Sequence, residues 1–389
     1  MSHLMNTYAR LPVAFTHGKG CTLTDAEGRT YLDAIAGIAV NTLGHAHPAF
    51  TAALAEQVGR LLHVSNLYQI REQETLAEML TARSGLAEVF FCNSGCEANE
   101  AAIKLARFYG HQRGIEHPAI VVMENAFHGR TLATLSATGN RKVQKGFEPL
   151  VEGFLRVPYN DLEAIRSVAK RKDIVAVMLE VIQGEGGVCL ASDDTLRGIR
   201  RICDENGWLL ICDEVQCGMA RTGKWFGYQH AGILPDVFTL AKGLGSGVPV
   251  GACLAGGKAA GLFGPGNHGS TFGGNPFAMT AGLRTIEIIE AEGLREKAVT
   301  TGETLRRELG AALAGVSGVR EIRGRGLMIG IELDRPCGAL VKAALEAGLL
   351  INVTHESVIR LLPPLIFSEA EARELTEKLI PLIQNFLKD

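Results

Sequence analysis

The chain has 389 residues, a length that predicts two or three domains and a core large enough to be stable without disulfides or structural metals. Apolar residues make up 47% and charged residues 21%, which is typical of a globular protein and excludes a mainly disordered chain. The formal net charge of −3 gives no electrostatic basis for binding nucleic acid or an anionic membrane. Glycine is enriched, with 46 residues, as in proteins whose backbone closely approaches a ligand.

The nine cysteines are scattered and show no Cys-x-x-Cys spacing, which disfavours zinc ribbons and thioredoxin-type redox motifs. We therefore expect reduced thiols and a cytoplasmic protein. The longest aliphatic run, residues 174–182, is interrupted by Glu180 and is far shorter than the ~20 residues that a membrane span requires. His45 and His47 lie two apart, but no further ligand accompanies them, so no metal site is expected.

In chain order, apolar runs alternate with amphipathic segments, which predicts an α/β fold with a largely parallel sheet covered on both faces. Strands are predicted at residues 89–91, 120–123, 174–179, 209–212 and 237–240. Helices are predicted from Pro48, around residues 76–80, after Gly95, from an Asn160 cap to Lys170, and from a Ser192 cap to about Gly207.

The pattern changes at Pro276, where two long helical stretches are followed by a strand region, a helix, two short strands and a terminal helix. We expect a large ligand-binding domain over residues 46–275 and a smaller α+β domain over residues 276–389. Residues 1–45 are too few for a domain of their own and are expected to join the smaller one.

Two charged residues stand where buried strands end. Asp213 follows the run 209–212, and ligands in open α/β sheets bind at that edge, although an Asp in this place can also cap a helix. Lys242 follows the run 237–241 and enters a glycine-rich loop. A lysine at a buried strand end is unusual unless it is paired or covalently used. Burial also lowers the pKa of its ammonium group, which makes the lysine a competent Schiff-base nucleophile.

A third feature joins these two charged residues. It is Ser94-Gly95-Cys96, which lies between a strand and a helix, where backbone N–H groups bind phosphate. Together, phosphate cup, acid and lysine indicate pyridoxal 5'-phosphate (PLP). The loop 243–247 lacks the third glycine of a dinucleotide fingerprint, which disfavours NAD. Residues 251–258 are out of register with a Walker A loop, which disfavours ATP.

With these residues the chain resembles the class III, fold-type I PLP aminotransferases, and most of all the acetylornithine aminotransferases of arginine biosynthesis. The resemblance runs essentially end to end, through segments 44–48, 93–100, 127–130, 183–187, 213–216, 241–243, 269–276 and 360–364. It implies a mixed seven-stranded sheet in the large domain. The chain departs from the family pattern at Cys96, where Thr or Ala is common, and at Val181, where Pro is usual.

The resemblance also implies roles around the cofactor. Lys242 would bind PLP covalently and act as the catalytic base, and Asp213 would pair with the ring nitrogen. The other implied contacts are Gly95 and Cys96 at the phosphate, Phe127 on the ring, Val215 and Gln216 on its other side and at its phenolic oxygen, and Thr271 at the phosphate in the neighbouring subunit of a homodimer.

The roles implied toward substrates concern carboxylates. Arg130, with Ser270, would bind the α-carboxylate of the donor, and Tyr8 would touch its distal end. Arg360 would bind the α-carboxylate of glutamate or 2-oxoglutarate. Glu185 would pair with Arg360 when the donor has no carboxylate there.

The implied reaction transfers the ω-amine of N2-acetyl-L-ornithine to 2-oxoglutarate and gives N-acetyl-L-glutamate 5-semialdehyde and L-glutamate. Alternative donors are succinylornithine, N-succinyldiaminopimelate, ornithine and GABA, and an aminomutase or racemase would be a different reaction on the same cofactor. A binding protein on a decayed enzyme fold is disfavoured because Lys242, Asp213 and Arg130 are all present.

Overall fold

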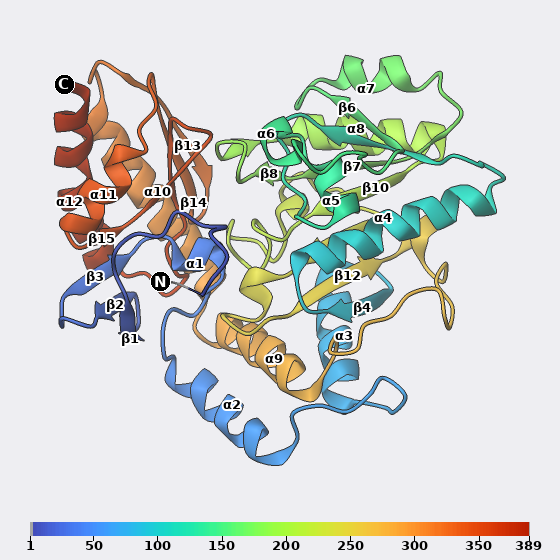
Figure 1. Cartoon of the computed structure of the whole chain (residues 1–389), viewed down its shortest axis with the longest axis horizontal. Coiled ribbons are helices and arrows are strands. Elements are labelled where there is room, and N and C mark those ends of the chain that lie inside the picture. Colours follow the sequence, from blue (N-terminus) through green and yellow to red (C-terminus); the bar gives the residue numbers. More distant parts are fainter. Residues whose placement is uncertain (1–2, 389) are drawn as a thin grey trace.

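A seven-stranded sheet forms the centre of the large half of this computed structural model, which describes residues 3–388 (Figure 1). The strand order is β4-β12-β11-β10-β7-β5-β6. Only β12 among these strands runs antiparallel to its neighbours, which confirms the mixed, mostly parallel sheet. The strands are β4 (Glu88–Cys92), β5 (Ala119–Met123), β6 (Phe154–Val157), β7 (Ile174–Glu180), β10 (Leu209–Asp213), β11 (Val237–Leu240) and β12 (Gly251–Ala255).

Helices cover both faces of this sheet. Leu209 and Ile211 of β10 share a core cluster with α4 (Gly95–Gln112), whereas Leu210 and Cys212 share another with α8 (Asp193–Asn206). This alternation follows from the two-residue period of a strand buried on both sides. Other elements of this half are α2 (Pro48–Arg60), α3 (Arg71–Ser84), α5 (Leu132–Ala137), α6 (Arg141–Gln144), α7 (Leu162–Val168), β8 (Ile182–Gln183), β9 (Cys189–Leu190) and the 3-10 turns at Gly227–His230, Lys242–Leu244 and Gly257–Ala259.

The helix caps are partly as predicted. Ser192 caps α8 by accepting a hydrogen bond from the Thr195 N–H, as expected. The prediction that Asn160 caps the next helix is wrong, because Asp161 accepts from the Ala164 N–H at the start of α7. Asn160 instead adopts a left-handed φ of +64° and uses its amide to reach the strand region around β9.

The C-terminal part builds a second sheet, with order β13-β14-β17-β16, beside long helices, on the left of Figure 1. Three short strands follow α11, where two were predicted. The elements are α9 (Pro276–Ala291), α10 (Leu294–Leu313), β13 (Val319–Arg325), β14 (Met328–Leu333), α11 (Ala339–Glu346), β15 (Leu349–Leu350), β16 (Asn352–Thr354), β17 (Val358–Leu361) and α12 (Glu369–Lys388).

The N-terminal segment forms strands β1 (Phe15–Lys19), β2 (Thr22–Asp25) and β3 (Thr30–Asp33) and the short α1 (Ala36–Ala39). β3 pairs in parallel with β15, so this segment lies with the C-terminal elements, as Figure 1 also shows. The division of the chain at residues 45 and 275 stays a prediction. No helix among residues 3–388 is long and apolar enough to cross a membrane.

Candidate active site

Three polar residues lie side by side at the carboxyl edge of the large sheet. Asp213 ends β10, and the strand registers place it opposite Glu180 of β7 on one side and Thr239 of β11 on the other. A cavity of about 400 Å³ opens at this edge, and Glu180, Asp213 and Lys242 line it. Asp213 and Lys242 thus line the same cavity at the edge where the sequence predicted them, and ligand binding there stays a prediction.

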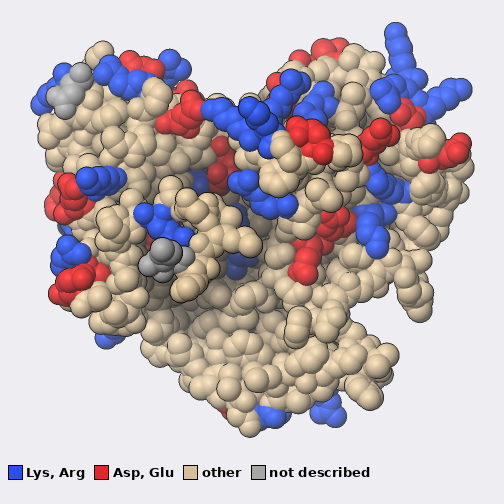
Figure 2. All heavy atoms as spheres, viewed as in Figure 1, with Lys and Arg blue, Asp and Glu red and all other residues tan. Residues whose placement is uncertain are grey.

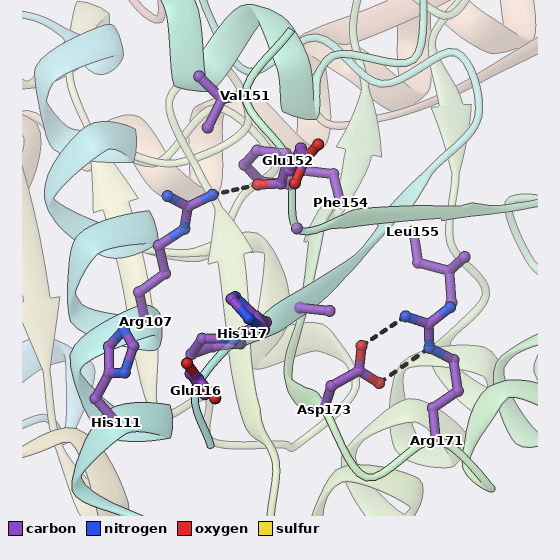
Figure 3. Close-up of a pocket in the computed structure, with 13 residues that line it drawn as sticks. Arg107, His111, Glu116, His117, Val151, Glu152, Phe154, Leu155, Arg171 and Asp173 are labelled. Carbon is purple, nitrogen blue, oxygen red and sulfur yellow. Dashed lines mark hydrogen bonds and ion pairs between the residues drawn. The ribbon is translucent and has the colours of Figure 1, made fainter. Parts of the chain in front are cut away.

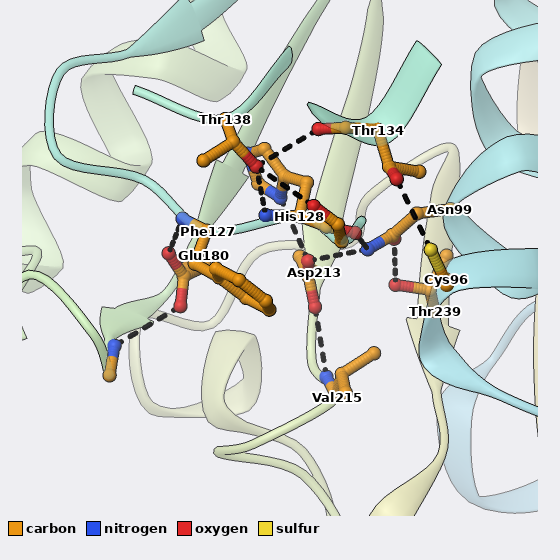
Figure 4. Close-up of polar contacts among 12 residues, drawn as sticks. Cys96, Asn99, Phe127, His128, Thr134, Thr138, Glu180, Asp213, Val215 and Thr239 are labelled. Atoms are coloured by element: carbon orange, nitrogen blue, oxygen red, sulfur yellow. Dashed lines mark hydrogen bonds and ion pairs between the residues drawn. The ribbon is translucent and has the colours of Figure 1, made fainter. Parts of the chain in front are cut away.

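The Asp213 carboxylate is 4% exposed and is held by three N–H donors (Figure 4). Its Oδ2 lies 2.8 Å from Nδ1 of His128 and accepts a 2.8 Å bond from the Asn99 amide. Its Oδ1 accepts from the Val215 N–H at 3.1 Å. Because a carboxylate only accepts, Nδ1 of His128 carries the proton, and its buried Nε2 has no partner among the described residues.

Asn99 connects this network to two strands and one loop. Its amide also donates to the His128 carbonyl at 2.8 Å, and its Oδ1 accepts from the Thr239 hydroxyl at 2.7 Å. Every hydrogen-bonding group of the buried Asn99 side chain is therefore used. A fully satisfied buried network of this kind fixes the direction of the Asp213 carboxylate.

Lys242 begins the 3-10 turn after β11 with a left-handed φ of +39°, an unfavourable conformation for a residue with a side chain. Desolvation and the nearby Arg360 charge lower the pKa of its ammonium group. Within residues 3–388 its side chain makes no hydrogen bond or ion pair. A strained, desolvated and unpaired lysine at the cavity wall is suited to nucleophilic attack on a carbonyl.

The N-terminus of α4 forms the opposite end of the cavity. The Ser94 hydroxyl caps the helix by accepting from the Glu97 N–H, and the N–H groups of Gly95 and Cys96 have no carbonyl partner within the helix. A Cβ at Gly95 would meet Val215 at 2.7 Å, so only glycine allows this close approach. This end of the cavity can receive an anion such as a phosphate.

Glu180 ties two loops of the site together. Its Oε1 accepts from the Phe127 N–H at 2.8 Å, and its Oε2 accepts from the Gly184 N–H at 3.1 Å (Figure 4). Desolvation and then the neighbouring Asp213 charge raise the pKa of Glu180 to about 7. The loops that carry Phe127 and Glu185 thus meet at one buried carboxyl group.

Arg360 of β17 is 1% exposed, and each nitrogen of its guanidinium has a hydrogen-bond partner. Nη1 lies 2.7 Å from Glu185 Oε1 and donates to Gln216 Oε1 at 3.2 Å. Nε and Nη2 donate to Asn352 Oδ1 at 2.9 and 2.7 Å. Glu185 is 40% exposed, so it can leave the pair more easily than the buried Arg360.

Apart from Glu185 and Arg360, the predicted site residues fall into two groups. The cavity wall includes Gly95, Cys96, Phe127, Arg130, Asp213, Val215, Gln216 and Lys242. Ser270, Thr271 and Tyr8 do not line it: Ser270 accepts from the Asn93 amide at 3.2 Å beside the cavity, Thr271 is exposed, and Tyr8 is 71% exposed under the Arg10 guanidinium.

The family profile described as aminotransferase class-III matches residues 4–383, which includes all of this edge. The chain belongs to the class III aminotransferases. It is 60% identical over 389 residues to the acetylornithine aminotransferase of Nitrosomonas europaea, covering 100% of this chain and 99% of that protein.

Two solved structures carry the same fold. The N-acetylornithine aminotransferase of Stenotrophomonas maltophilia superposes with a TM-score of 0.86 at 34% identity, covering 98% of each chain. An ornithine aminotransferase of Toxoplasma gondii superposes with a TM-score of 0.95 at 31% identity, covering 100% of this chain and 94% of that one. That structure is described as having partial occupancy of PLP at its active site.

This aminotransferase uses PLP, and the residues at the carboxyl edge fit that cofactor. The unpaired N–H groups of Gly95 and Cys96 suit its phosphate, and the oriented Asp213 carboxylate suits a protonated ring nitrogen. The unpaired Lys242 suits its aldehyde.

Three residues of the network were not assigned from the sequence. Glu180 carries the same signal as Asp213, a carboxylate at the end of a buried strand, yet it was treated only as an interruption of an apolar run. Asn99 follows Gly95 by about one turn of α4, so its direction toward the cavity follows from helical periodicity. Asn352 reaches Arg360 through strand pairing, which has no local signal.

Proposed function

We propose that this enzyme transfers the ω-amine of N2-acetyl-L-ornithine to 2-oxoglutarate, giving N-acetyl-L-glutamate 5-semialdehyde and L-glutamate. The observation that carries this proposal is the Arg360–Glu185 pair. The donor has no carboxylate at its reacting carbon, whereas 2-oxoglutarate does. A buried arginine left unpaired in the first half-reaction is costly, by several kcal/mol in comparable cases, and Glu185 removes that cost by pairing.

The residues of the site divide the chemical work. PLP, when bound, delocalises the negative charge that develops on the donor's δ-carbon. Lys242 Nζ takes the proton from that carbon, and its lowered pKa keeps a fraction of the amine neutral. Asp213, held by His128 and Asn99, keeps the ring nitrogen protonated. Phe127, which lines the same cavity, would cover one face of the ring.

The charges around the outer part of the cavity favour a donor with a single carboxylate. A second cavity of about 550 Å³, the outer cavity, adjoins the first. Its charged lining residues are Arg130, Glu185, Lys142 and Glu356. Lys142 pairs with Glu356, and Glu185 pairs with Arg360. Among the described charged residues of this cavity, Arg130 alone has no ion pair. An N-acetyl donor needs one cation here, whereas an N-succinyl donor brings a second carboxylate.

A donor panel tests the reaction. The purified PLP-loaded enzyme is given 2-oxoglutarate and, separately, acetylornithine, succinylornithine, N-succinyldiaminopimelate, ornithine and GABA, and glutamate is measured. We expect the largest kcat/KM with acetylornithine. A larger value with another donor would replace the substrate assignment, and a product from one donor without consumption of 2-oxoglutarate would indicate an aminomutase.

We also infer a homodimer in which Thr271 reaches the cofactor phosphate of the partner. In the single chain Thr271 is exposed, and Figure 2 shows a face with few charged side chains at the bottom of the molecule. Exposed large apolar residues gather in the same segments, namely Val58, Leu61, Leu62, Leu67, Tyr68 and Phe272. Exposed apolar residues in such number support an interface with a partner chain. We expect sedimentation equilibrium to give the mass of a dimer. We also expect Thr271→Ala to bind PLP with lower affinity than wild type.

A cytoplasmic location is part of the same proposal. All nine cysteines are free within the described residues, as in a reducing compartment. Fractionation of the source cells is expected to recover the activity in the soluble cytoplasmic fraction.

A further inference from the structure

The turn that carries Arg130 lies directly on α4. Gly129 adopts a φ of +143°, and a Cβ there would meet the Cys96 sulfur and the Thr134 hydroxyl, each at 2.5 Å. No other residue type fits this approach without moving the turn. The peptide around Gly129 is therefore pressed against one side chain of the cofactor-binding helix.

Two side chains of α4 bind the N–H groups that follow. The Arg130 and Thr131 N–H groups donate to Cys96 Sγ at 3.2 and 3.3 Å. One turn further along α4, Glu100 Oε1 accepts from the Thr134 N–H at 3.3 Å and from the Thr131 hydroxyl. Thr131 makes no side-chain cap of its own for α5, so Glu100 caps this helix from α4, and Cys96 holds the two residues that precede the helix.

Little else fixes Arg130. Its guanidinium forms no ion pair within residues 3–388 and lies 5.7 Å from the centroid of the Phe127 ring. Its direction into the outer cavity thus depends on where the backbone of the turn is held. Since Cys96 also has an N–H group that would face the cofactor phosphate, one residue would serve both functions.

We propose that Cys96 and Glu100 are positioning residues that hold Arg130 in place to receive a substrate carboxylate. The inference rests on the proposed role of Arg130 and goes beyond the phosphate contact expected of Cys96. The thiol sulfur acts as an acceptor for two N–H groups. Serine can replace that acceptor and alanine cannot.

The first test separates carboxylate binding from cofactor binding. Glutarate, which carries both carboxylates of 2-oxoglutarate but does not react, is titrated calorimetrically into PLP-loaded wild type and into the variants Cys96→Ala, Cys96→Ser, Glu100→Ala and Glu100→Gln. We expect glutarate affinity to fall about five-fold in Cys96→Ala and Glu100→Ala, and less than two-fold in Cys96→Ser and Glu100→Gln, which keep an acceptor. PLP affinity of the apoenzymes, measured by absorbance titration, should stay within two-fold. The control is Cys337→Ala, because Cys337 lies in the C-terminal part.

The second test asks whether the effect passes through Arg130. In an Arg130→Ala background, adding Cys96→Ala should change glutarate affinity less than 1.5-fold, because coupled residues are not additive. An unchanged glutarate affinity in Cys96→Ala, a parallel loss of PLP affinity, or an equal effect in both backgrounds would overturn the proposal. None of these readouts requires turnover, so they remain valid if another donor replaces acetylornithine.

Discussion

The two edges of the large sheet each hold a cavity, and only one of them is built for chemistry. The carboxyl-edge cavity is about 400 Å³, and the amino-edge cavity, before β5, β6 and β7, is about 430 Å³ (Figure 3). At the amino edge, Arg171 forms an ion pair with Asp173 at the surface, and Arg107 donates to the Glu152 carbonyl. At the carboxyl edge, Asp213 is buried and Lys242 is unpaired. Desolvated and directed charge, rather than volume, distinguishes the candidate active site from the other cavity.

The largest effect is expected from Lys242→Ala. Loss of the base alone should lower single-turnover proton abstraction by ~10²–10⁴-fold, and loss of the covalent bond to the cofactor lowers it further. Lys258, whose ammonium group donates to the Trp208 carbonyl at the amino edge, provides the control Lys258→Ala. Near wild-type turnover by Lys242→Ala would end the assignment.

Asp213→Asn is expected to come next, because it keeps the shape and removes the charge. We expect a loss of roughly 10²–10³-fold in proton abstraction, measured with acetylornithine under single-turnover conditions. Thr239→Val, which removes a hydroxyl that reaches only Asn99, should lose much less. If the two variants are equally impaired, packing rather than charge explains the role of Asp213.

Glu185→Ala should change the balance between the two half-reactions. Without its partner, Arg360 is free to bind the glutamate carboxylate and is left unpaired with acetylornithine. We expect the ratio of the glutamate rate to the acetylornithine rate to rise about ten-fold. Glu356→Ala, which alters the exposed Lys142 pair in the same outer cavity, is the control. Equal losses in both half-reactions would leave Glu185 a structural partner only.

Glu180→Gln should change the pH dependence of stability. The pKa of Glu180 is raised to about 7 from an ordinary 4.5. Its contribution to the free energy of unfolding is therefore fully present below pH 4.5 and is lost as the pH rises through 7. The free energy of unfolding of wild type should therefore fall relative to the variant between about pH 5 and 8, by at most roughly 1.4 kcal/mol per pH unit. The exposed Glu303→Gln should leave this slope unchanged.

The smallest effect is expected at the amino edge. Arg107→Ala removes a cation that stacks over Phe154 and contacts one carbonyl group. We expect kcat/KM to stay within two-fold of wild type. A loss beyond five-fold would show that the amino-edge cavity also serves the reaction, and the contrast between the edges would fail.

Local patterns of the sequence were enough for the strands that carry the site. β10 and β11 are short, fully buried apolar runs, so their ends, and with them Asp213 and Lys242, could be located. β12 was missed because its glycine and alanine residues give a weak strand signal. Its small residues are needed there: a Cβ at Gly251 would meet the Ser94 carbonyl oxygen at 2.4 Å.

Contacts between distant segments were not predictable from local pattern. The Arg360–Asn352 bond depends on the register of β16 with β17, and the Arg130 turn depends on how α4 meets α5. The Arg360–Glu185 pair was expected, but only through the family resemblance. Where the partners of a residue lie on other helices or strands, its role can be assigned only from a known structure or from a related protein.

The pairing of β3 with β15 has a consequence for synthesis. β3 leaves the ribosome early, whereas its partner at Leu349–Leu350 is made near the end of translation. Until then one edge of the N-terminal sheet has unpaired N–H and C=O groups, which are open to pairing with other chains. A nascent chain stalled before Leu349 is therefore expected to aggregate through its first strands, even after its large sheet has formed.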